Sequence, residues 1–150
     1  EGDNKIEETN SSALNSASSN SNVTNSNTAE TSSNVSDDYF TKSKLERDTM
    51  YSQMLETYEK VLNSANSLET QKQSATQEIT KINDTKNSIM VSENLLQTKG
   101  FNNAIIFVNG DSVSVIIGKE ELKQEEVAQI QNIISREMKA KIENIHISTK

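Results

Sequence analysis

The chain has 150 residues, a formal net charge of −7 and no cysteine. A chain of this length accommodates one ordinary domain, and the missing cysteines exclude disulfides, thiolate metal sites and cysteine nucleophiles. Most of the charge lies in residues 1–38, which hold seven acids and one lysine, so the remainder is almost neutral and lacks the basic field that collects phosphates.

Residues 1–37 are predicted to be a disordered linker, and residues 38–150 the folded domain. Between Thr9 and Ser36, 21 of 28 residues are Ser, Asn or Thr, so the segment buries too little apolar surface to offset a chain entropy of about 1–2 kcal/mol per residue. No apolar run approaches the roughly 18 residues of a membrane span. Because the chain opens with Glu rather than Met, we expect a fragment or processed product from which any N-terminal anchor is missing.

A first helix is predicted from Asp38 to Leu62, with Ser36 or Asp37 as its N-cap. Apolar residues follow the three-and-four spacing of one buried stripe. Because this stripe is more apolar than a helix outlying a small core requires, we expect some of its residues to bind another protein: Tyr51, Met54, Tyr58 and Leu62. The alternative is that the stripe packs on the second helix or the sheet.

The second helix is predicted from about Leu68 to Lys99, and Asn66 followed by Glu69 has the spacing of a capping box. Its apolar residues fall seven apart, at Leu68, Ala75, Ile82, Ile89 and Leu96, while the alternate seam is mostly charged. This pattern favours a surface helix buried along one thin line over a dimerising coiled coil, which needs both seams filled. Lys99-Gly100 is a strong stop signal.

After Gly100 the period changes to that of strands. The segment Ala104–Val108 is apolar on both faces, Asn109-Gly110 is favoured in tight hairpins, and Ser112–Ile117 alternates cleanly. A third helix is predicted from about Gln124 to Lys139, before a last strand that contains Ile145 and Ile147. The first strand is the one that is apolar on both faces, which predicts a central place and a sheet order of 2-1-3. The second and third helices should cover one face, and the fold class is α+β.

In this order the second strand is an exposed edge. It contains no Lys, Pro or Glu, residues that hinder pairing of an edge strand with another chain. It is therefore predicted to accept a partner's strand. Val113, Val115 and Ile117 should face the core, and Ser112, Ser114 and Ile116 the opposite side, as candidate interface residues. The alternative is that the first helix or a loop covers this edge.

Residues that could carry catalysis are scarce. The one histidine, His146, should point away from the core because it alternates with Ile145 and Ile147, and we interpret it as solvated or interfacial. Acid pairs such as Glu125-Glu126 suit a helix start. The element order invites comparison with KH-type RNA-binding modules, but their Gly-x-x-Gly loop and basic groove are missing. We therefore predict no catalytic, cofactor or metal site and no nucleic-acid binding.

Short segments across the folded part carry a family resemblance. They are Asp38–Phe40, Arg47-Asp48, the break at Asn63–Ser67, Leu95–Phe101, Asn103–Phe107, Val113–Ile117, Glu121-Leu122, Val127–Ile130 and Asn144–Ile147. In order and spacing, over about residues 38–150, they resemble the stage III sporulation protein AH family of endospore-forming bacteria. One departure is Lys123, where we expect a Ser; Lys cannot cap a helix N-terminus, which puts the start of the third helix in doubt.

The resemblance implies a mother-cell membrane protein with one N-terminal span, absent from this chain, whose outer domain faces the intermembrane space around the engulfed forespore. Family members bind stage II sporulation protein Q, a peptidase-like domain protein of the forespore membrane. Their domain is similar to ring-building modules of secretion and flagellar systems and is thought to assemble into a channel. We therefore expect a non-enzymatic adaptor that also binds copies of itself. The competing interpretation is a soluble solute-binding or regulatory α/β domain, with a hydrolase last.

Overall fold

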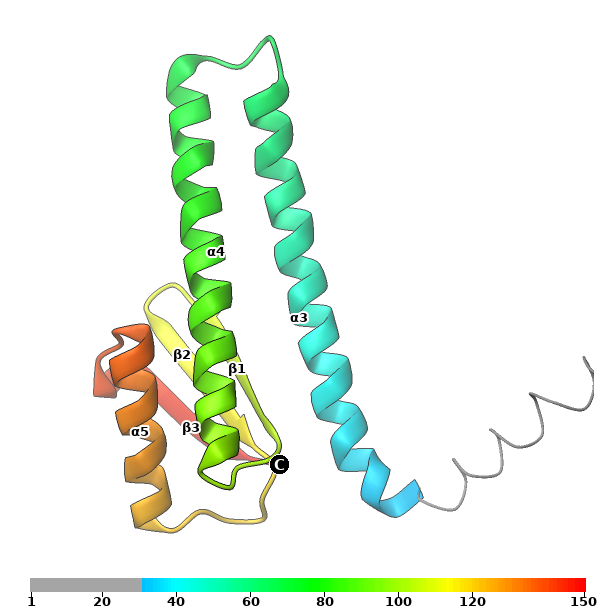
Figure 1. Ribbon diagram of the computed structural model, residues 1–150, viewed down its shortest axis with the longest axis vertical. Helices are drawn as coiled ribbons and strands as arrows, with labels where there is room; N and C mark the ends of the chain where they lie inside the picture. Colours follow the sequence, from blue (N-terminus) through cyan, green and yellow to red (C-terminus); the bar gives the residue numbers. More distant parts are fainter. Residues whose placement is uncertain (1–30) are drawn as a thin grey trace, which may run out of the picture. The chain divides into compact units, whose positions relative to one another are not determined.

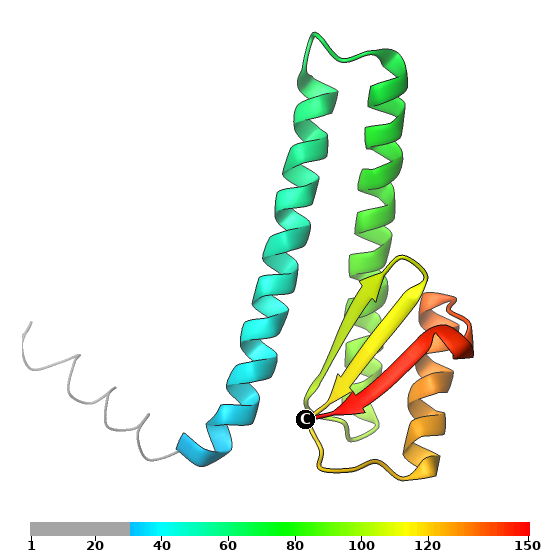
Figure 2. The same ribbon diagram turned by 180° about the vertical axis from the view of Figure 1, so that it is seen from behind.

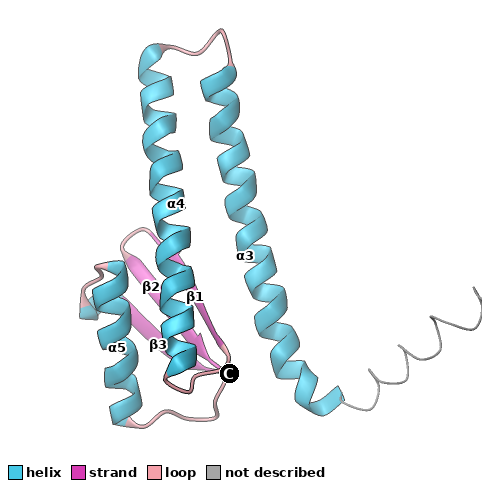
Figure 3. Ribbon diagram, in the orientation of Figure 1, coloured by secondary structure: helices cyan, strands magenta, loops and turns pink. Residues whose placement is uncertain are grey.

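The computed structural model describes residues 31–150, and residues 36–150 form one compact unit. Along the chain the elements are α3 (Thr31–Asn63), α4 (Glu69–Thr98), β1 (Ala104–Asn109), β2 (Ser112–Ile117), α5 (Gln124–Met138), the 3-10 turn η1 (Ile142–Asn144) and β3 (Ile145–Thr149) (Figure 1, Figure 3). This order confirms the predicted α-α-β-β-α-β arrangement. The predicted linker lies outside the described residues except for 31–37, which belong to α3.

The starts of the first two helices differ from the prediction. Because α3 begins at Thr31, neither Ser36 nor Asp37 is its N-cap; adding residues to an existing helix costs far less than nucleating one. The prediction of a capping box between Asn66 and Glu69 was also wrong. The N–H of Leu68 donates to Gln71 Oε1 at 2.8 Å, while the N–H of Asn66 donates to the Ser64 hydroxyl within the connecting turn.

The end of α4 confirms Lys99-Gly100 as the stop signal. Gly100 has a φ of 100°, and its N–H donates to the carbonyl of Gln97. The next N–H, that of Phe101, donates to the carbonyl of Leu96 at 3.0 Å, and both of these side chains are buried. These paired bonds form a Schellman motif, which satisfies the last carbonyls of the helix and redirects the chain into β1.

A single line of α4 is buried, as the heptad spacing predicted, except that Leu68, the first residue of the predicted line, is exposed. Its buried residues are Ala75, Ile82, Ile89, Ser92 and Leu96. The C-terminal half of α4 and the whole of α5 lie on the same face of the sheet (Figure 1), where they pack on each other and on β1 and β3. The prediction that the second and third helices share one face is therefore confirmed.

The strand order is β1-β2-β3, so the predicted order 2-1-3 was wrong. β2 pairs antiparallel with β1 and parallel with β3, and the β2-α5-β3 crossover therefore joins neighbouring strands with no gap between them. β1 is apolar on both faces for a different reason: α4 packs on it, and α3 reaches its outer edge through Arg47. Because helices cover β1, this edge strand has the apolar sequence that is typical of a central strand.

The faces of β2 were predicted correctly. Val113, Val115 and Ile117 are buried in the core that the sheet forms with α4 and α5. Gly110 and Asp111 form the two-residue turn between β1 and β2, with a Gly110 φ of 62°, which a β-hairpin connection of this length requires. On the last strand His146 is exposed, also as predicted.

Candidate protein-interaction site

The predicted stripe on α3 faces inward. Tyr51 is 6% exposed and belongs to the hydrophobic core, and Met54 and Tyr58 pack against that core while partly exposed. Leu62 is half-buried near the end of the helix. The structure therefore supports the alternative for Tyr51: it is a packing residue, because α3 lies against the rest of the domain. Burial also raises the pKa of the Tyr51 phenol, with a smaller opposing effect from Arg47.

The second set of predicted residues lies on the central strand. Because β2 is paired on both sides, its main chain has no free edge, and strand addition at β2 is excluded. The side chains of Ser112, Ser114 and Ile116 do point away from the buried face and are half-exposed. They remain candidates as side chains on a sheet face, whereas their predicted role at a sheet edge was wrong.

Figure 2 shows the sheet face opposite α4 and α5. The exposed set belongs to this face because its members alternate with the buried residues of β2. In the pairing register, Ser114 lies between Phe107 of β1 and His146 of β3, and Ser148 lies beside Ile116. We call Phe107, Ser114, Ile116, His146 and Ser148 the open sheet face. Phe107 and Ile116 are half-buried, and His146 and Ser148 are exposed. Ile105, opposite Ile116 on the same face, is fully buried, so the exposed part of the face combines two apolar side chains with polar ones. This mixture is typical of a protein-binding surface.

Residues 37–40 of α3 are fixed to one end of the sheet. Asn103 donates a hydrogen bond to Asp37 at 2.7 Å, and the Lys150 ammonium lies 4.4 Å from the centre of the Tyr39 ring. Phe40 is buried, and its ring lies 3.0 Å from the position that a Cβ on Gly118 would take. α3 is therefore held by specific side-chain contacts.

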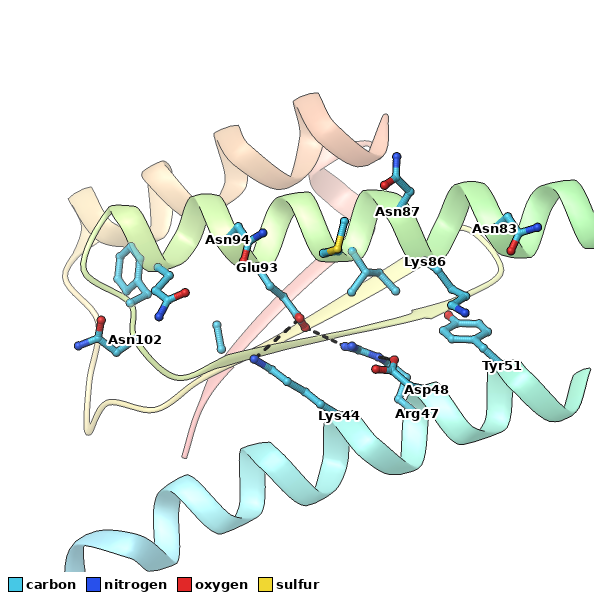
Figure 4. A pocket seen from close by; sticks show the side chains of 15 residues that line it. Lys44, Arg47, Asp48, Tyr51, Asn83, Lys86, Asn87, Glu93, Asn94 and Asn102 are labelled. Atoms are coloured by element: carbon cyan, nitrogen blue, oxygen red, sulfur yellow. Dashed lines mark hydrogen bonds and ion pairs between the residues drawn. The ribbon is translucent and has the colours of Figure 1, made fainter. Parts of the chain in front are cut away.

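Sequence reasoning missed the main polar feature of this region, an ion pair at the outer edge of β1. Arg47 donates to Glu93 Oε2 at 2.7 Å (Figure 4). Arg47 also donates to the carbonyl of Ile106 at 2.8 Å, and the same Glu93 oxygen accepts from the N–H of Ile106 at 3.0 Å. Lys44 approaches the other Glu93 oxygen at 3.8 Å. We call Arg47 and Glu93 the β1 clamp.

The β1 clamp is largely removed from solvent. The side chains of Arg47 and Glu93 are 6% and 11% exposed. Burial by itself lowers the pKa of Arg47, but the hydrogen bond and charge of Glu93, with Asp48, outweigh it and raise that pKa. One feature of the sequence indicated this ion pair: Arg47 is the single arginine in a helix whose other basic residues are lysines. Arg is suited to fixed contacts that use several hydrogen bonds.

A groove of about 540 Å³ lies around the clamp, between α3, α4 and the start of β1. Amide side chains line much of its α4 wall, including Asn83, Asn87, Asn94 and Gln97. The central charged groups are already bonded to each other and to Ile106, so they offer little to a solute. Within residues 31–150 no cluster of His, Asp and Glu is arranged to hold a metal ion.

A model of the SpoIIIAH-like protein family matches residues 1–147. The chain belongs to that family. This confirms the resemblance to stage III sporulation protein AH. No curated protein is significantly similar to the chain.

Among solved structures, a chain in the SpoIIQ–SpoIIIAH pore-forming complex has the same fold. The TM-score is 0.67 at 16% sequence identity, over 75% of this chain and 96% of that chain. At this identity the likeness establishes the fold. Within residues 31–150, no helix has the length and hydrophobicity that a membrane crossing requires.

Proposed function

We propose that this SpoIIIAH-like chain is a non-enzymatic assembly protein of sporulation that binds a SpoIIQ-type partner and associates with copies of itself. The observation that carries the proposal is the family match over residues 1–147, supported by the shared fold with a chain of the SpoIIQ–SpoIIIAH pore-forming complex. Arg47 and Glu93 at the centre of the groove are bonded to each other and to Ile106, which favours an assembly role over solute binding. We place partner binding in residues 38–150.

The proposed location follows from the same family. The domain would face the intermembrane space between mother cell and forespore, tethered to the outer forespore membrane by a span on the N-terminal side of Glu1. Assembly into a ring or channel, as in similar ring-building modules, belongs to this proposal.

The open sheet face is the surface that we propose for the heterologous partner. Its half-exposed Phe107 and Ile116 provide apolar contact area, and Ser114 lies between Phe107 and His146 in the pairing register. Apolar anchors encircled by small polar residues give affinity when a partner excludes water from them. The face is also separate from the core residues of β2, so substitutions on it can be tested without emptying the core.

The test is Ser114→Arg. A long charged side chain at the centre of the face should weaken binding of a SpoIIQ-type outer domain at least tenfold, while the melting temperature changes little because Ser114 is outside the core. The matched control is Ser74→Arg, an exposed position on α4. Isothermal titration calorimetry measures both variants. Undiminished affinity in a folded Ser114→Arg protein would move the interface to another surface.

A further inference from the structure

The outer edge of β1 has main-chain groups that β2 does not use. The N–H and C=O of Ile106 bond to Glu93 and Arg47, so they point away from β2. Main-chain direction alternates along a strand, so those of Ala104 and Val108 point outward as well. The carbonyl of Asn103, one residue out of phase, bonds instead to the N–H of Gly118 on the β2 side. The edge of β1 is therefore a potential strand-pairing site.

The β1 clamp occupies the centre of this site. In an antiparallel sheet, a residue of the neighbouring strand gives one N–H and one C=O to its opposite residue. At Ile106 the Arg47 guanidinium takes the place of that N–H, and the Glu93 carboxylate that of the C=O. The ion pair thus imitates a missing strand, and α3 supplies half of it.

The sequence of β1 identifies the occupant that the clamp excludes. Ala104–Asn109 contains no charge, proline or glycine and is rich in β-branched and aromatic residues, which is the signature of segments that pair with their own copies. An uncharged strand has no like-charge repulsion against itself. With both groups of Ile106 outward, two copies can pair antiparallel about Ile106, where each residue exchanges two hydrogen bonds with its equivalent.

We propose that β1 is a latent pairing edge for β1 of a second copy of this chain, and that Arg47 and Glu93 hold it closed while α3 is docked. Edge strands in sheets are commonly protected by charges or by covering elements. Here one buried ion pair does both, because it satisfies the edge and fastens the helix that covers it. Self-association through β1 then requires release of α3.

The experiment is charge reversal at the clamp, with Arg47→Glu in the full chain. Two carboxylates facing each other at this position release α3 and leave the carbonyl of Ile106 without a donor. The matched control is Arg136→Glu, since Arg136 is the other arginine of the chain and its side chain is 65% exposed. Sedimentation velocity over a concentration series should show a dimer for Arg47→Glu at concentrations at which the control is still monomeric. A folded Arg47→Glu protein that stays monomeric overturns the proposal.

Val108→Pro, added to Arg47→Glu, tests whether the dimer uses this edge. Proline removes the outward N–H of Val108, which symmetric pairing about Ile106 needs and the β1–β2 ladder does not. Restored monomer supports the proposal, and a persistent dimer places the association elsewhere and overturns it.

A measurement on the unmodified protein covers the case in which Arg47→Glu does not fold. Amide hydrogen exchange at Ile106 should be at least tenfold slower than at Val108, because the clamp bonds one outward N–H and not the other. Equal exchange at the two residues would show that the clamp does not close the edge.

Discussion

The hydroxyl of Ser92 is fully buried on α4 with no hydrogen-bond partner. A buried polar group without a partner costs about 1–3 kcal/mol. Replacing the hydroxyl by hydrogen removes that cost and barely changes the packed volume. We therefore predict that Ser92→Ala stabilises the domain by about 1 kcal/mol.

Chemical denaturation measures this change. Ser74→Ala, at an exposed position of the same helix, reports the gain from helix propensity alone and should be smaller. A loss of stability in Ser92→Ala would show that the hydroxyl makes a contact that matters to the fold.

Glu126 links the start of α5 to the preceding loop. Its carboxylate accepts from the Lys119 ammonium and, at 2.9 Å, from the N–H of Lys123. These two bonds lower the pKa of Glu126 below its ordinary 4.5. They also explain how α5 begins at Gln124 although Lys123 provides no side-chain cap: Glu126 completes the reverse half of a capping box.

The lowered pKa of Glu126 predicts how the stability of the domain changes in acid. A group whose pKa is lower in the folded state stabilises the fold above its unfolded pKa, and this contribution is lost as the pH falls through the folded value. The unmodified protein should therefore melt higher than Glu126→Gln at neutral pH, and the difference should shrink once the pH falls below 4.5. A difference that stays constant in acid would contradict the assigned bonds.

At the scale of elements, the approach of α3 to the sheet depends on Gly118. A Cβ at this position would lie 2.8 Å from the Cβ of Asn103 and 3.0 Å from the Phe40 ring. Because the Asn103 Cβ is fixed to the main chain, the ring or the strand must move. We predict that Gly118→Ala destabilises the domain by about 1–3 kcal/mol.

Phe40→Leu in the Gly118→Ala background separates the two possible causes. If the clash with the ring dominates, the smaller side chain should recover part of the loss in thermal denaturation. If Gly118→Ala melts like the unmodified protein, α3 is not held against the sheet at Phe40.

Local signals determined most of the elements. The seven-residue spacing on α4, the Gly100 stop and the alternation along β2 each depend on neighbouring residues, and each was predicted from them. The order of the strands was not predictable in the same way. β1 looked central because hydrophobicity reports burial without saying whether a strand or a helix provides it. The same ambiguity placed Tyr51 at an interface, although its side chain is buried in the core.

The β1 clamp shows why the rest of the candidate site could not be predicted from the sequence. Arg47 and Glu93 are 46 residues apart, and both bond to the main chain of Ile106, a contact that leaves no sequence motif. Ser112, Ser114 and Ile116 were placed on the correct face by alternation, but their edge role depended on the wrong strand order. Long-range pairing decides both features, and composition and periodicity do not encode it.

At the scale of the whole molecule, different surfaces are assigned to the partner and to copies of the chain. The open sheet face is proposed for the heterologous partner, while the β1 clamp blocks pairing between copies through β1. Copies that assemble with α3 docked must then meet through other surfaces. This division is consistent with an assembly protein that has to distinguish its partner from itself.

The most direct test of the central claim is binding between this chain and the outer domain of a SpoIIQ-type protein. Size-exclusion chromatography with light scattering, at tens of micromolar of each protein, should show a complex whose mass equals the sum of one copy of each. Removal of residues 1–30 should leave the complex intact, and Ser114→Arg should abolish it. Separate elution of the two unmodified, folded proteins at these concentrations would contradict the proposed function.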